Sequence, residues 1–260
     1  MRFFLTTIAT SALLIGCGQP TPKIETPNTE TSKTTAIAPA TSYDIHRQYE
    51  KFAEVPMNPD VSFLTDSERK VVNKLIEASD YLSKIYLLQR GADYPKRRAE
   101  LETSGTAIEK AMFDLHFGPC DTLEDDNHVF VGDTPCSAGA GFYPADMTKA
   151  EFEQWITVHP EDKEAFTSGY TVIRRTDDGG LKAVPYHIEY AEYLKPAASL
   201  LRQAAKETKN KNLAKFLRLR ARAFLNDDYF QSEMAWMDLD GPIEIAIGPY
   251  EVYDDGLFAL

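Results

Sequence analysis

Side chains that could form a reaction centre are spread thinly along this sequence. Its five histidines are unpaired, because none lies three or four residues from another; they are His46, His116, His128, His159 and His187. Spacing of that kind would place two imidazoles on one helical face, where they could share a zinc ion. The sequence also lacks His-Glu-x-x-His, Gly-x-Ser-x-Gly and a phosphate-binding glycine-rich loop. We therefore expect no metal site made from this chain alone.

An acidic run raises the separate question of calcium. Its members are Asp121, Glu124, Asp125, Asp126 and Asp133. A calcium loop needs oxygen ligands at alternate positions, a central glycine and a terminal glutamate, and this run does not have that spacing. We interpret it as a solvated acidic loop, with a calcium site as the alternative.

The richest group of chemically useful side chains lies near the C-terminal end. It is the segment Ala235-Trp-Met-Asp-Leu-Asp-Gly-Pro-Ile-Glu-Ile-Ala-Ile-Gly-Pro-Tyr-Glu-Val-Tyr-Asp-Asp255. A Trp before a Gly-Pro-Ile strand, followed by Gly-x-x-Glu-x-Tyr-x-Asp, resembles the corresponding part of dipeptidyl peptidase III family zinc peptidases. Upstream stretches are also similar, namely 141–146, 170–175, 184–186 and the helical run to Tyr229. The resemblance extends from about Thr65 to the last residue.

This resemblance implies roles for two residues. Glu251 would hold the free amino terminus of a peptide, and Tyr253 would donate a hydrogen bond to the scissile carbonyl oxygen. A donor aimed at the developing oxyanion stabilises charge that exists only in the transition state. Without the resemblance, the alternative is a strand whose Glu and Tyr simply face solvent and core.

Zinc is the cofactor of the complete family. In the family its ligands, a His-Glu-x-x-Gly-His helix and a further glutamate, come well after this motif, whereas only seven residues follow Tyr253 here. Without zinc such a peptidase lacks its activated water and its Lewis acid. We therefore expect the amino-terminal portion of such an enzyme, truncated or split, with no cofactor in this chain and no activity alone. The alternative is a non-catalytic surface lipoprotein that binds peptides or a partner, including a chain that carries the zinc half.

Hydrophobic periodicity predicts the elements that position this motif. Apolar residues at helical spacing predict a helix over Thr65 to Arg90, with a Thr65–Glu68 capping box and Gly91 just past its end. Further helices are expected at 105–113, 148–156, 160–169, 188–205 and 213–225, with Pro196 either kinking the fourth or opening a new one.

Strands are expected to be few and short. Residues 170–175 and 181–184 flank an Asp-Gly-Gly turn and predict a hairpin, and the alternation over 243–247 predicts a strand. The fold class is therefore α+β, mostly helical with a few short strands, and resembles part of a two-lobed zinc peptidase.

The N-terminal residues have the layout of an export signal. Met1 and Arg2 precede an apolar stretch from Phe3 to Ile15, which is too short to span a membrane. Leu14-Ile15-Gly16-Cys17 resembles a lipobox, so Cys17 is expected to carry lipid after cleavage of residues 1–16; an ordinary signal peptide with a chance cysteine is the alternative. Because Gly18, not Asp, follows, we expect a lipid anchor on the periplasmic side of the outer membrane.

Composition divides the residues after the expected signal into two parts. Residues 17–42 are rich in Pro, Thr and Ser without apolar periodicity, which is typical of a disordered tether, and 43–260 form the peptidase-like globular region. The net charge of −12 repels phosphate backbones, so we expect no nucleic-acid partner. Once Cys17 is lipidated, Cys120 and Cys136 remain, and we expect them to form a disulfide in an oxidising compartment, with two free thiols as the alternative.

Overall fold

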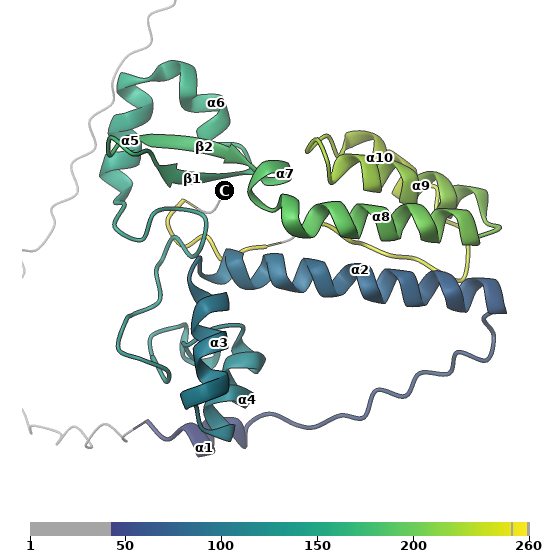
Figure 1. Ribbon diagram of the computed structural model, residues 1–260, viewed down its shortest axis with the longest axis horizontal. Coiled ribbons are helices and arrows are strands. Elements are labelled where there is room, and N and C mark those ends of the chain that lie inside the picture. Colours follow the sequence, from purple (N-terminus) through teal and green to yellow (C-terminus); the bar gives the residue numbers. More distant parts are fainter. Residues whose placement is uncertain (1–42, 251, 259–260) are drawn as a thin grey trace, which may run out of the picture. The chain divides into compact units, whose positions relative to one another are not determined.

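The computed structural model describes residues 43–250 and 252–258 (Figure 1). The expected signal, the lipidated Cys17, the tether and Glu251 lie outside the described residues. Tyr43 opens one compact unit. In chain order its elements are α1 Ile45–Tyr49, α2 Asp66–Arg90, α3 Tyr94–Ser104, α4 Ala107–His116, the 3-10 turn η1 Thr122–Glu124, α5 Lys149–Val158, the 3-10 turn η2 Pro160–Asp162, α6 Lys163–Phe166, β1 Thr171–Arg175, β2 Leu181–Pro185, α7 Tyr186–Glu189, α8 Ala191–Glu207, α9 Lys211–Ala223 and α10 Phe230–Trp236.

Four helices pack in succession to make most of the core. The helix α2 lies along α8, α8 packs on α9, and α9 packs on α10, an arrangement that Figure 1 shows with α2 and α8 side by side. The predicted capping box is present: the Thr65 hydroxyl accepts from the Glu68 amide, and the Glu68 carboxylate accepts from the Thr65 amide at 2.8 Å. The predicted helix is confirmed, although its buried face turns toward Val71 and Ala78 and leaves Ile76 57% exposed.

Pro196 neither ends α8 nor opens a new helix. The helix runs unbroken from Ala191 to Glu207 with Pro196 inside it, and it buries Leu194, Ala198 and Leu201. The next helix, α9, agrees with its predicted range and buries Leu213, Phe216, Leu217 and Ala221. Both helices thus present to α2 or to each other the apolar faces that their periodicity predicts.

Helices α3 and α4 pack around a second, smaller apolar cluster. Its buried members are Tyr94, Leu101 and Phe113. The sequence predicts α4, which begins after a Thr106–Glu109 capping box. It does not predict α3, whose apolar residues are too few to give a helical period; α3 starts with Pro95 in its first turn.

The hairpin is confirmed as an antiparallel pair. Val172 faces Val184 and Ile173 faces Ala183, and the turn places Gly179 at φ 86°, a backbone conformation that glycine adopts without strain. In Figure 1, α5 and α6 lie beside this hairpin. Mostly helical structure with two short strands confirms the predicted fold class for the described residues.

Residues 243–247 do not form the predicted strand. Ile243 and Ile247 are buried while Glu244 is exposed, so the alternation of burial is real. The segment nevertheless lies along α9, where Asn210 contacts Asp240 and Arg220 contacts the Ile247 carbonyl, and among the described residues no strand pairs with it. Ile245, Leu257 and Phe258 are partly buried and pack on the main core. None of the helices in the described ranges is long and apolar enough to cross a membrane.

Candidate functional site

Tyr253, the candidate catalytic residue, lies on the wall of a cavity of about 310 Å³. Its own side chain is 91% exposed. The other walls are largely aromatic, and they include Tyr143, Phe166, Tyr170, Tyr186 and Tyr250, with Asp255 as a carboxylate. Glu251, the candidate substrate-binding residue, lies between Tyr250 and Val252, outside the described residues. The motif Gly-x-x-Glu-x-Tyr-x-Asp spans residues 248–255, which we call the motif segment. It borders a recess that combines apolar surface with a few polar groups, as small-molecule and peptide sites do.

The backbone at Gly141 lies close against α2, and this contact positions the aromatic residues that follow on the cavity wall. The Gly141 amide donates to the Gln89 carbonyl at 2.8 Å, and a Cβ at Gly141 would lie 1.8 Å from the Leu88 carbonyl oxygen. Only glycine fits there, which is why Phe142 and Tyr143 can follow directly against the core.

Asp255 is the buried carboxylate of the cavity. It accepts from the Tyr143 hydroxyl at 2.9 Å and from the amides of Leu257 and Phe258 at 2.8 and 3.1 Å. Burial, and then the charge of Asp255, raises the pKa of Tyr143 far above its ordinary value, so this phenol remains a donor at neutral pH. The contact fixes the chain two residues beyond Tyr253.

Arg220 holds the opposite end of the motif. This side chain is almost fully buried on α9; one nitrogen donates to the Ile247 carbonyl at 2.9 Å and another to the Glu233 carboxylate at 2.6 Å. The same Glu233 oxygen accepts from the Tyr250 hydroxyl at 2.6 Å, and the guanidinium lies 5.4 Å from the centre of the Tyr250 ring. Burial lowers the pKa of Arg220, and Glu233 opposes this shift. These contacts orient Tyr250, a cavity wall residue.

The last turn of α2 supplies two further contacts. Buried Gln89 donates to the Pro249 carbonyl at 2.6 Å. Arg90 donates to Asp254 at 2.6 Å and to both oxygens of Asp126 at 3.0 and 3.2 Å. Burial alone would lower the pKa of Arg90, but the two carboxylates outweigh it and raise the pKa, so the guanidinium is charged.

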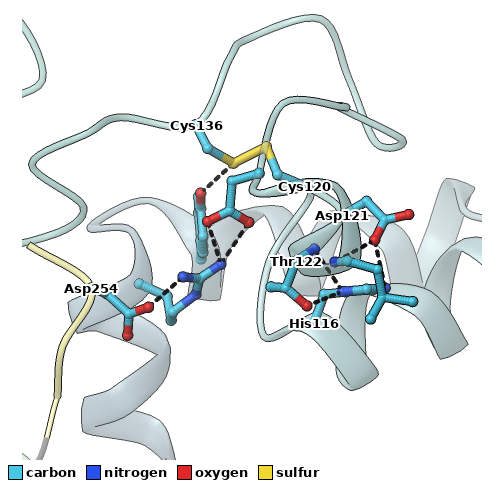
Figure 2. A network of polar contacts seen from close by, with 10 residues as sticks. His116, Cys120, Asp121, Thr122, Cys136 and Asp254 are labelled. Carbon is cyan, nitrogen blue, oxygen red and sulfur yellow. Dashed lines mark hydrogen bonds and ion pairs between the residues drawn. A yellow bond between two sulfur atoms is a disulfide. The ribbon is translucent and has the colours of Figure 1, made fainter. Parts of the chain in front are cut away.

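Asp126 belongs to a loop closed by a disulfide between Cys120 and Cys136 (Figure 2). The Tyr94 hydroxyl lies 2.8 Å from the Cys136 sulfur. Asp121, fully buried, accepts from the Leu123 amide and from the Tyr43 hydroxyl. The interpretation of the acidic run as a solvated loop is therefore wrong for Asp121 and Asp126, whose carboxylates have partners within the fold.

Histidines and acids do not gather into a metal site in the described ranges, where no group of three His, Cys, Asp or Glu side chains is close enough to hold an ion. His116 is buried, and its Nδ1 accepts from the Thr122 amide at 3.0 Å, as Figure 2 shows. His187 Nδ1 lies 2.6 Å from an Asp227 carboxylate oxygen. The described residues therefore do not fit the zinc that the resemblance implies.

These features define a mostly helical α+β unit that holds an extended C-terminal segment over an aromatic cavity. The chain is similar to the structure of DPP III from Caldithrix abyssi, with 45% identity and a TM-score of 0.79 over 82% of this chain and 41% of that chain. It is similar to dipeptidyl-peptidase III from Corallococcus sp. strain EGB, with 40% identity and a TM-score of 0.79 over 83% of this chain and 41% of that chain. The fold is thus dipeptidyl peptidase III-like, and the chain spans about two fifths of the length of these structures.

A curated protein gives a more distant match. Nudix hydrolase 3 from Arabidopsis thaliana is 28% identical over 273 aligned residues, which cover 84% of this chain and 35% of that protein. No protein-family profile matches the chain. This chain spans only about a third of that relative, so the match says nothing about the activity of this chain.

Sequence reasoning missed the residues that hold the motif in place. Arg90, Gln89, Arg220 and Glu233 lie 17 or more residues from Tyr250 in the chain, on three helices. A charged residue on the apolar side of a predicted helix was the available signal: Arg220 falls on the same face as Phe216 and Leu217. A basic side chain in such a place needs a buried partner.

Proposed function

We propose that this chain is the peptide-binding portion of a dipeptidyl peptidase III-like peptidase and that it binds the free amino end of peptides. The observation that carries the proposal is the 45% identical likeness to a DPP III structure, combined with the position of Tyr253 on the aromatic cavity. The motif segment is held at both sides of Tyr253, by Glu233 at Tyr250 and by Arg90 at Asp254. Such preorganisation lowers the entropic cost of binding.

In this proposal each part of the site has one role. The Glu251 carboxylate pairs with the α-ammonium group and so selects the end of the peptide that enters. The Tyr253 phenol donates to a peptide carbonyl oxygen. The aromatic walls take an apolar side chain of the peptide, whose burial contributes about 25 cal/mol per Å².

Binding is tested by calorimetry with the tetrapeptide Phe-Leu-Ala-Ala and two variants. Glu251→Gln removes the charge opposite the ammonium, and we expect about tenfold weaker binding, which corresponds to about 1.4 kcal/mol. Tyr253→Phe removes one donor, and we expect a loss of about fivefold. Tyr49→Phe is the matched control, because Tyr49 is exposed and does not line the cavity, and this variant should bind like the wild type. Equal affinity in all four proteins would contradict the assigned roles.

We also propose that this chain alone hydrolyses no peptide. Catalysis by zinc needs three protein ligands in a set geometry, and the residues described do not offer them. The zinc ligands would lie on polypeptide outside this sequence, in the same protein or in a partner chain. Purified chain should therefore contain no stoichiometric zinc and release no dipeptides.

The second candidate is a non-catalytic lipoprotein that uses the same surface to bind peptides or a partner. The two candidates differ in one result. Dipeptide release on mixing with a polypeptide that carries His-Glu-x-x-Gly-His favours the peptidase, and binding without release favours the second candidate.

Export and anchoring form a further part of the proposal. Lipidation of Cys17 would hold the globular region at the periplasmic side of the outer membrane, since several acyl chains give a lasting anchor. Cys17→Ser should abolish labelling by a fatty-acid analogue. Membrane association of that variant after a high-salt wash would show that the anchor lies elsewhere.

A further inference from the structure

One buried cation joins two segments that are far apart in the chain. The Arg90 side chain is 7% exposed and forms ion pairs with Asp254, next to Tyr253, and with Asp126 in the disulfide loop. In Figure 2, Asp254 lies below the disulfide, and a dashed line marks its contact with this guanidinium. A guanidinium can bind two carboxylates at once because its five N–H groups form a planar fork, which an ammonium lacks.

The Asp126 side of this junction is firmly held. The disulfide closes the loop, the Asp121 amide donates to the His128 carbonyl at 2.9 Å, and the Asp126 amide donates to the Asp121 carbonyl at 3.0 Å. Asp125 and Asp126 have φ of 53° and 57°, a left-handed conformation that persists only where the surroundings fix it. The loop therefore presents the Asp126 carboxylate to Arg90 in one geometry.

The Asp254 side of the junction bears directly on Tyr253. The Tyr253 side chain is largely exposed. On its C-terminal side Arg90 holds the neighbouring Asp254 at 2.6 Å, and the Gly256 amide donates to the Ala138 carbonyl at 2.7 Å, so two contacts fix the backbone that follows Tyr253. Ala138 itself follows Cys136 by two residues.

From this geometry we infer that Arg90 is a positioning residue for Tyr253, and that the disulfide-closed loop acts on the peptide site through Asp126. The inference rests on the proposed peptide binding. Loss of the Asp126–Arg90 contact lets Arg90 shift from Asp254, and the motif segment then samples orientations in which the Tyr253 phenol misses the peptide carbonyl. Peptide affinity falls although no residue that touches the peptide has changed.

The test compares two neighbouring aspartates in the full chain. Asp126→Asn removes the charge that Arg90 binds, and we expect about fivefold weaker binding of Phe-Leu-Ala-Ala by calorimetry. Asp125→Asn is the matched control, because Asp125 is exposed and also left-handed, and it should bind within about twofold of the wild type. Arg90→Lys keeps the positive charge but removes the planar fork, and it should weaken peptide binding about as much as Asp126→Asn. If Asp126→Asn does not fold, the affinity of Arg90→Lys tests the inference in its place.

A double-mutant cycle separates positioning from a general loss of stability. In the Tyr253→Phe background, Asp126→Asn should cause no further loss of affinity, because the donor that it positions is absent. Equal binding by wild type and Asp126→Asn, or a loss that adds fully to that of Tyr253→Phe, would overturn the inference while leaving the proposed function intact. Absence of measurable binding by the wild type would overturn the proposed function and the inference with it.

Discussion

At the scale of single residues, the buried guanidinium groups of Arg90 and Arg220 hold the motif segment by direct contacts with Asp254 and the Ile247 carbonyl. Glu233 supports one of these groups, since one of its oxygens accepts from both Arg220 and Tyr250. Arg220 has a 2% exposed side chain and Glu233 a 47% exposed one, so removal of Glu233 leaves a buried cation without its anion.

We therefore predict that Glu233→Ala lowers the free energy of unfolding by about 2 kcal/mol, below the usual cost of breaking a buried pair because Glu233 is partly solvated. Urea denaturation monitored by circular dichroism measures the change. Glu153→Ala, at an exposed helical position, is the control and should change stability by less than about 0.5 kcal/mol. Equal stability of the two variants would show that the pair contributes little.

His116 makes the stability of the fold depend on pH. Its Nδ1 accepts the Thr122 amide, so the buried ring must be neutral, and burial lowers its pKa although Asp121 opposes the shift. A pKa that is lower in the folded than in the unfolded state gives stability that is present above about pH 6.5, the unfolded value, and is lost as the pH falls through the folded pKa.

Urea denaturation at several values between pH 5 and 7.5 should show this loss, with a slope of at most about 1.4 kcal/mol per pH unit for one proton. His116→Gln should remove the histidine contribution to that slope, whereas His159→Gln, at a half-exposed side chain, should leave it unchanged. Parallel pH profiles for wild type and His116→Gln would contradict the assignment.

At the scale of elements, the disulfide loop is the part most dependent on covalent closure. Between Cys120 and Cys136 the regular structure is limited to the short turn η1 and one β-bridge between Cys120 and Val129, so no longer helix or strand ladder opposes unfolding of the loop. Closing a loop of this length stabilises a protein by about 3 kcal/mol in the chain-entropy model.

We predict that Cys136→Ser lowers the free energy of unfolding by about this amount, measured by urea denaturation against the unreduced wild type. Mass spectrometry of a digest without reduction should recover the peptides of Cys120 and Cys136 as one linked species. Recovery of both as free thiols from protein taken from an oxidising compartment would refute the bond.

Some helices and strands could be predicted from the sequence and others could not, because only some of them carry local signals. Helices α2, α4, α8 and α9 carry capping residues or a regular apolar face, and the hairpin carries an Asp-Gly-Gly turn, so local signals suffice. Residues 243–247 have the alternation of a strand, but pairing depends on a neighbouring strand that local sequence does not reveal. Likewise Tyr253 could be found from its motif, whereas Arg90 and Glu233 could not, because their roles arise from contacts between distant helices.

At the scale of the whole described unit, contacts from several elements converge on residues 247–256. The helices α2, α9 and α10, the loop that carries Tyr143 and the disulfide loop each contribute at least one polar contact to this segment or to the residues that hold it. This convergence supports the binding role that we propose for the segment.

The most direct test of this account is calorimetric titration of the wild-type chain with Phe-Leu-Ala-Ala and with its N-acetylated form. Acetylation removes the positive charge and leaves the apolar side chains and carbonyl groups unchanged. If the site recognises the amino end, the free peptide should bind at least about tenfold more tightly than the acetylated one, a difference of about 1.4 kcal/mol. Equal affinity for both peptides, or no binding of either, would contradict the account.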